Sequence, residues 1–158
     1  MPSDAEVVST LNSLIETCRD GEGGFRTAAE GVKRAELREL FQRYAQQRAA
    51  FAGELQDEVR RLGGDPEREG SLAGSLHRGW MGLRAALEGG DERAIVGECQ
   101  RGEDAALAAY RSALDTDMPA NVRALVERQF AEVKEAHHLI GNLAGGFGRG
   151  RLKQSTDD

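Results

Sequence analysis

The chain has 158 residues, a formal net charge of −6 and only 5% aromatic residues. This length is sufficient for one domain with a hydrophobic core, and the abundance of Ala, Leu, Glu and Arg favours helices over sheets. The negative charge argues against nucleic acid as a partner. No apolar run approaches the roughly 18 residues of a membrane-spanning helix. The two cysteines form no disulfide framework, so we expect a reducing, cytoplasmic location.

Apolar residues recur at steps of three and four along four long segments, which is typical of amphipathic helices. We predict helices over residues 4–32 and 35–62, a shorter crossover helix over 71–87, a helix from Asp91 to Leu114 and a last helix over 119–143. Ser3 or Asp4 has a side chain suited to cap the first helix, and Asp91 can cap the fourth. The glycines and proline of residues 63–66 end the second helix.

The lengths of the connections define how the predicted helices are arranged. The connection at residues 33–35 is very short, so the first two helices must pack antiparallel. The long segment that follows lets the third long helix run parallel to the second. We therefore predict an all-α, ferritin-like antiparallel four-helix bundle over residues 1–144, followed by a disordered, glycine-rich polar tail over 145–158.

Each long helix carries one ionisable residue within its apolar stripe. Residues 18–22 and 99–103 both read Cys-x-x-Gly-Glu, which suggests a duplicated helix pair and places Glu22 and Glu103 in matching contexts. Arg48 and His137 occupy the equivalent inward spacing on the other two helices. Because a charged group on an apolar face is costly unless it is paired, protonated or bound to a metal, these four residues form the candidate site.

Two interpretations of this candidate site follow from the residues. In the first, Arg48 holds Glu22 and Glu103 by charge-assisted hydrogen bonds and His137 completes a buried polar network that fixes the helix register. In the second, Glu22, Glu103 and His137 bind one metal ion, iron or manganese, or a small ligand. Neither interpretation assigns a catalytic residue.

A conventional di-iron ferroxidase centre is not expected. Such centres take a Glu-x-x-His pair from each of two helices. The helix over 35–62 has no such pair and places Arg48 and Phe51 at its centre, where a guanidinium would repel metal ions. Glu135 and His138 match the motif on the last helix, but the spacing turns them away from the buried side.

We expect structural roles for the two cysteines, for Trp80 and His77, and for a group of glycines. Cys18 and Cys99 are predicted as small core residues rather than thiolate ligands. Trp80 is expected to anchor the crossover helix on the bundle, and His77 to cap it or to hydrogen-bond. Glycines weaken a helix interior, so the group beside Glu22 requires close packing or space for a ligand; it consists of Gly21, Gly23 and Gly24.

Several phrases of the sequence together resemble a known bacterial family. They are CRDGEGGF at 18–25, LF-x-x-YA at 40–45, LGGDP at 62–66, HRGW at 77–80 and RGED at 101–104. The chain resembles, over roughly residues 5–143, the ferritin-like four-helix-bundle family called domain of unknown function 2383. The resemblance implies a ferritin-like bundle and supplies no reaction. Compared with ferritins and rubrerythrins, Glu22 and Glu103 look similar to the lone helix glutamates, whereas Arg48 and Phe51 replace the expected Glu and His.

The leading functional expectation is a small cytoplasmic, stress-associated ferritin-like bundle protein whose central polar cluster is structural or holds one metal or small ligand. The stress association is an analogy with the fold. One alternative is a metal-dependent oxidase, or a peroxide-handling enzyme, that uses iron or manganese. Another is an assembly module in which exposed bundle faces form a homodimer.

Overall fold

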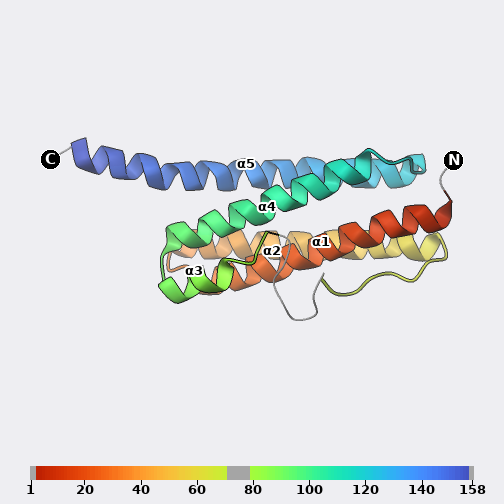
Figure 1. The fold of residues 1–158 in the computed structure, drawn as a ribbon, viewed down its shortest axis with the longest axis horizontal. Helices are drawn as coiled ribbons and strands as arrows, with labels where there is room; N and C mark the ends of the chain where they lie inside the picture. Colours follow the sequence, from red (N-terminus) through yellow and green to blue (C-terminus); the bar gives the residue numbers. More distant parts are fainter. Residues whose placement is uncertain (1–2, 71–78, 157–158) are drawn as a thin grey trace.

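The computed structural model describes residues 3–70 and 79–156, the last ten of these by their backbone alone. Within these ranges the chain forms five helices, which are α1 (Asp4–Gly31), α2 (Ala35–Arg61), α3 (Leu83–Gly89), α4 (Glu92–Leu114) and α5 (Ala120–Thr156). The four long helices lie side by side and α3 packs outside them (Figure 1). None of the described helices is long and apolar enough to cross a membrane.

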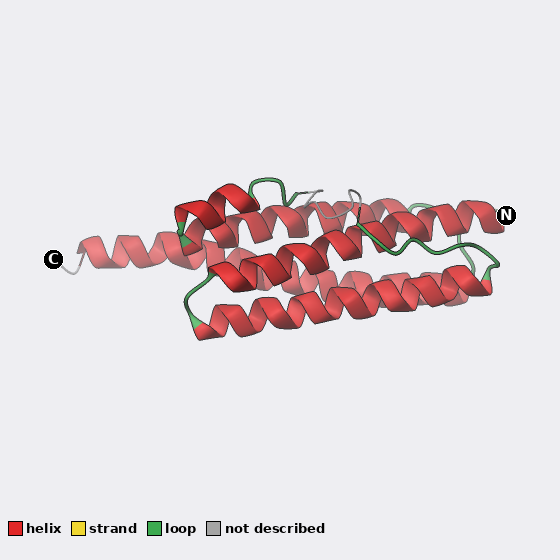
Figure 2. Ribbon diagram, turned by 90° about the horizontal axis from the view of Figure 1, so that it is seen from below, coloured by secondary structure: helices red, strands yellow, loops and turns green. Residues whose placement is uncertain are grey.

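The helices form two antiparallel hairpins, α1–α2 and α4–α5. The linker after α2 returns along the outside of the bundle (Figure 2), so α4 runs parallel to α2 and antiparallel to its neighbour α1. Ser3 caps α1 by accepting a hydrogen bond from the Glu6 amide, and Asp91 caps α4 by accepting one from the Arg93 amide. The predicted ferritin-like bundle, its crossover and both caps are therefore confirmed.

Two predicted helix boundaries are wrong. The crossover helix begins only at Leu83, because Gly79 has a φ of +93° and residues 79–82 form turns; residues 71–78, which include His77, lie outside the described ranges. The last helix does not end at residue 143 but continues to Thr156 and projects past the other helices (Figure 1). Each glycine costs a helix only about 1 kcal/mol and does not forbid it. The division into a bundle over 1–144 and a tail over 145–158 stays a prediction.

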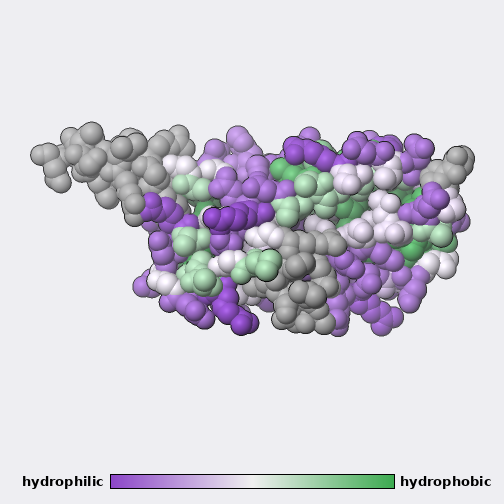
Figure 3. Space-filling view, in the orientation of Figure 1, coloured by the Kyte–Doolittle hydropathy of each residue, from purple (hydrophilic) through white to green (hydrophobic). Residues whose placement is uncertain are grey.

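The core consists of two apolar clusters, one toward each end of the bundle. The first gathers residues such as Leu11, Leu55 and Val126, and the second gathers residues such as Phe41 and Ile95. Hydrophilic residues cover much of the rim of the face drawn in Figure 3, and apolar residues reach its surface between α4 and α5. The candidate site lies where the two clusters meet.

Trp80 fills a slot between α1 and α4. Its side chain is only 1% exposed, and its indole lies directly against the backbones of Gly24 and Gly102. A Cβ atom on either glycine would overlap the indole ring. Trp80 therefore anchors the crossover on the bundle, as predicted, and it explains two of the glycines that interrupt long helices.

The slot makes a prediction about two glycines of α4. Gly102→Ala should destabilise the protein by about 1–3 kcal/mol because the new methyl group overpacks the indole. Gly97→Ala is the matched control: a Cβ there meets nothing within 4 Å, so we expect it to stabilise α4 by about 0.5–1 kcal/mol. Urea denaturation of both variants measures the difference, and equal effects would show that the slot is not tight.

Glu92 fastens the first turn of α4 to the α1–α2 connection. Its Oε1 accepts hydrogen bonds from the amides of Lys33 at 2.6 Å and Arg34 at 2.9 Å, and its Oε2 lies 3.2 Å from Arg34 Nε. Burial raises the pKa of the Glu92 carboxyl, but these hydrogen bonds and nearby positive charges outweigh burial and hold it below its ordinary value of 4.5.

This lowered pKa predicts how stability depends on pH. Because the folded state favours the carboxylate, its contribution is complete above pH 4.5 and is lost as the pH falls through the folded pKa. Glu92→Gln should cost about 1 kcal/mol at neutral pH, and the difference from the wild type should shrink in acid. Urea denaturation at several pH values tests this, with the exposed Glu88→Gln as control; a pH-independent difference would contradict the assignment.

Candidate functional site

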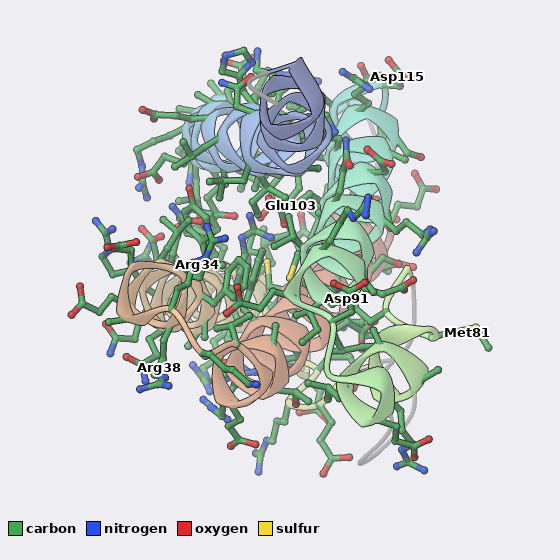
Figure 4. The ribbon with its side chains drawn as sticks, turned by 90° about the vertical axis from the view of Figure 1, so that its left-hand side faces the viewer. Arg34, Arg38, Met81, Asp91, Glu103 and Asp115 are labelled. Carbon is green, nitrogen blue, oxygen red and sulfur yellow. The ribbon has the colours of Figure 1, made fainter. Side chains whose placement is uncertain are left out.

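Arg48 of α2 and Glu103 of α4 form a bidentate ion pair at the centre of the bundle. Arg48 Nη1 donates to Glu103 Oε1 at 2.6 Å, and Nη2 donates to Oε2 at 2.7 Å. The Arg48 and Glu103 side chains are 2% and 0% exposed. Figure 4 shows Glu103 between the helices, whereas Met81 points away from the bundle. Both oxygens of this carboxylate are therefore engaged by one guanidinium.

The surroundings of Arg48 come from α1 and from its own helix. A Cβ on Gly21 would lie 3.4 Å from Arg48 Cγ and Nη1, so this glycine gives the arginine side chain room to cross α1. The guanidinium carbon lies 5.4 Å from the centre of the Phe25 ring, which is cation–π distance. Arg48 Nε donates to Gln47 Oε1 at 3.3 Å. The guanidinium thus has partners for all three of its nitrogens.

The charge of Arg48 is maintained by Glu103. Burial alone would lower the pKa of the guanidinium, because a low-dielectric interior disfavours the charged form. The negative charge of Glu103 and its hydrogen bonds outweigh burial, so the pKa of Arg48 is raised above its ordinary value. Arg48 therefore stays charged throughout the physiological pH range.

Glu22 is not a partner of Arg48, contrary to the predicted network. Its carboxylate accepts hydrogen bonds from Arg19 at 2.7 Å and Arg26 at 2.9 Å, both on α1, and its side chain is 15% exposed. The physical reason is that Gly21 faces Arg48. Successive residues of a helix point about 100° apart, so Glu22 is turned toward the rim of the bundle.

His137 also lies away from the ion pair. Its Nε2 is 2.6 Å from Asp104 Oδ1, and the two side chains are 30% and 61% exposed. This pair joins α5 to α4 at the surface. Asp104 follows Glu103 by about 100° around the axis of α4, so it faces the surface instead of the ion pair, and His137 meets it there. The predicted four-residue network is thus reduced to Arg48 and Glu103.

Metal ions in proteins are bound by clusters of acidic, histidine and cysteine side chains, so the metal interpretation requires such a cluster. Within the described ranges, no three or more of these side chains lie close enough together to hold a metal ion. Glu22, Glu103 and His137 each have a different partner, so the geometry gives no support to a shared metal site, which stays a prediction. Glu135 and His138 are exposed, as their spacing predicts.

A second buried polar chain escaped the sequence analysis. The Tyr110 hydroxyl donates to Gln129 Oε1 at 2.7 Å, and Gln129 Nε2 lies 3.3 Å from both the Phe51 carbonyl oxygen and Glu54 Oε1. The Cys18 thiol lies 3.3 Å from the Tyr110 hydroxyl. The available signal was Gln129, an amide within the apolar stripe of its helix, because a buried amide needs partners.

Both cysteines are buried and unpaired with each other, as predicted. Burial raises the pKa of the Cys18 thiol to about 11, and the contact with Tyr110 offsets only part of this effect. Burial and the charge of Glu103 raise the pKa of Cys99 well above its ordinary value. At both sites burial therefore disfavours the thiolate, which is the nucleophilic form of cysteine.

The topology defines the class: the protein is a ferritin-like four-helix bundle. A Dps1 point mutant from Mycobacterium smegmatis has the same fold with a TM-score of 0.71 and 11% identity, over 89% of this chain and 96% of that one. The chain belongs to the family described as Domain of unknown function (DUF2383), which matches residues 6–116. That match covers α1 to α4. It is shorter than the range of roughly residues 5–143 over which the sequence phrases resemble the family. No curated protein matches significantly.

The buried ion pair predicts a large effect of a single substitution. Arg48→Met should cost about 3–5 kcal/mol because it leaves the Glu103 carboxylate buried without a partner. The double variant Arg48→Met/Glu103→Met should recover most of that loss, since apolar residues of similar size often replace a buried ion pair without cost. Urea denaturation provides both values.

The control for this prediction is the same substitution at the surface. Arg60 pairs with Asp57 at 3.0 Å, and both side chains are more than half exposed. Arg60→Met should therefore change stability by no more than about 0.5 kcal/mol. If Arg48→Met were as mild as Arg60→Met, the ion pair would not be the structural centre of the bundle.

Proposed function

We propose that the protein is a ferritin-like bundle without a ferroxidase centre, in which the central ion pair is structural and function resides in assembly with other copies. The observation that carries this proposal is the bidentate contact of Glu103 with Arg48 at 2.6 and 2.7 Å. Both oxygens of this carboxylate are already bonded to a buried guanidinium, so a metal ion would have to compete with Arg48 for them. The cationic neighbour also opposes the approach of iron or manganese.

Three features support an assembly role. Helix α5 has 37 residues against 23 in α4, and its end projects past the bundle, where a second copy has room to pack (Figure 1). Leu139 of α5 is a large apolar side chain with 41% exposure. Apolar residues also reach the surface between α4 and α5 (Figure 3). These features favour a homodimer formed through the α5 side of the bundle.

The alternatives are a single metal or small-ligand site at Glu22, Glu103 and His137, and a metal-dependent oxidase or peroxide-handling enzyme that uses iron or manganese. Each would require Glu103 to leave Arg48 and the other two side chains to move toward it. The cytoplasmic location and the stress association remain expectations from composition and fold.

Metal analysis and sedimentation together test the proposal. Protein purified without chelator should contain iron and manganese well below one ion per chain, and adding either ion should leave the melting temperature unchanged. Sedimentation over a wide concentration range should show a dimer, and Leu139→Glu should shift it toward monomer, whereas Glu135→Gln on the same helix should not.

Each outcome has a direct meaning. One tightly held metal ion per chain that disappears in Glu103→Gln would favour the metal interpretation over the structural one. A monomer at every concentration would end the assembly proposal while leaving the structural role of the ion pair intact.

A further inference from the structure

The crossover segment, residues 79–82, connects the surface of the molecule to its central ion pair. Trp80 is 1% exposed and inserted between α1 and α4, whereas the next residue, Met81, is 75% exposed and points into solvent (Figure 4). Gly79 has a φ of +93°, and a Cβ there would approach the Arg101 carbonyl oxygen to 2.6 Å. The backbone of this segment is therefore fitted closely to α4.

Trp80 and the side chains of the ion pair both pack against α1 and α4. On α1, Gly21 gives room to Arg48 and Gly24, one turn later, gives room to Trp80. On α4, Gly102 lies against Trp80, and the next residue, Glu103, binds Arg48. A shift of either helix to accommodate a change at one site therefore moves the other site as well.

Phe25 lies between the two inserted side chains. Its ring meets the Trp80 indole edge-on, with centroids 5.0 Å apart and an interplanar angle of 73°. The guanidinium carbon of Arg48 lies 5.4 Å from the same ring. Tyr44 contacts the ring from α2, with centroids 5.3 Å apart. Close-packed side chains transmit displacement because few voids exist to absorb it.

We propose that Trp80 and the Arg48–Glu103 ion pair form one cooperative unit, through which a displacement of the crossover segment loosens the centre of the bundle and a loss of the ion pair releases Trp80. A change in the conformation of the crossover segment would then alter the packing of the core. This inference goes beyond the proposed assembly role and does not depend on it. If Trp80 only fills space, the ion pair and the indole respond independently.

The protein contains a single tryptophan, so its fluorescence reports on Trp80 alone. In Glu103→Gln, with helix content retained by circular dichroism, we expect the emission to shift to the red and the acrylamide quenching constant to rise severalfold. Glu92→Gln is the matched control because Glu92 contacts the α1–α2 connection and neither Trp80 nor Arg48. Unchanged emission and quenching in folded Glu103→Gln would overturn the proposal.

Two further measurements keep the proposal testable if Glu103→Gln does not fold. Arg48→Lys keeps the positive charge but loses the planar bidentate contact, so it should raise the quenching constant in the same direction by less. In the wild type, the urea transitions of Trp80 emission and of helix content should coincide. An earlier fluorescence transition would show that the indole leaves its slot independently, which contradicts a cooperative unit.

Discussion

The contact between Arg48 and Glu103 is the constraint on which the rest of the structure depends. Two ionised side chains taken out of water lose several kcal/mol of solvation each, and only a partner with matching geometry compensates for this loss. The planar guanidinium supplies that match by meeting both carboxylate oxygens. Since the two residues come from different hairpins, their pairing fixes the depth and rotation of α2 relative to α4. Apolar contacts alone tolerate sliding far better.

The same ion pair distinguishes the inward carboxylate of this bundle from those of a di-iron bundle. In a di-iron bundle, inward carboxylates are left with free oxygens that share metal ions. Here the inward carboxylate of α4 is neutralised by α2, and the corresponding glutamate of α1 is turned toward Arg19 and Arg26. The two Cys-x-x-Gly-Glu phrases therefore have different environments in spite of their identical spacing. Glu103 is a fully buried carboxylate, whereas Glu22 forms ion pairs with Arg19 and Arg26 at the rim of the bundle.

Helix periodicity was sufficient to predict the long helices, the two hairpins and the inward position of Arg48 and Glu103. It could not assign partners. A step of three or four residues defines a face about a third of a turn wide. Spacing alone therefore cannot decide whether Gly21 or Glu22 faces Arg48. His137 contacts Asp104 instead of Glu103 because Asp104 lies about 100° further around α4, and spacing does not resolve that rotation. The Tyr110–Gln129 contact requires the relative depth of α4 and α5, which no local pattern contains.

The indole of Trp80 has a geometric consequence for the width of the bundle. Two helices usually keep their separation through the side chains that they present to each other. Here α1 and α4 present glycines at Gly24 and Gly102, and a residue from outside both helices sets the gap between them. The spacing of the two hairpins is thus encoded in a connecting segment. A relative could adjust the width of its bundle by exchanging one spacer residue together with the two small residues that it touches, and leave every helix otherwise unaltered.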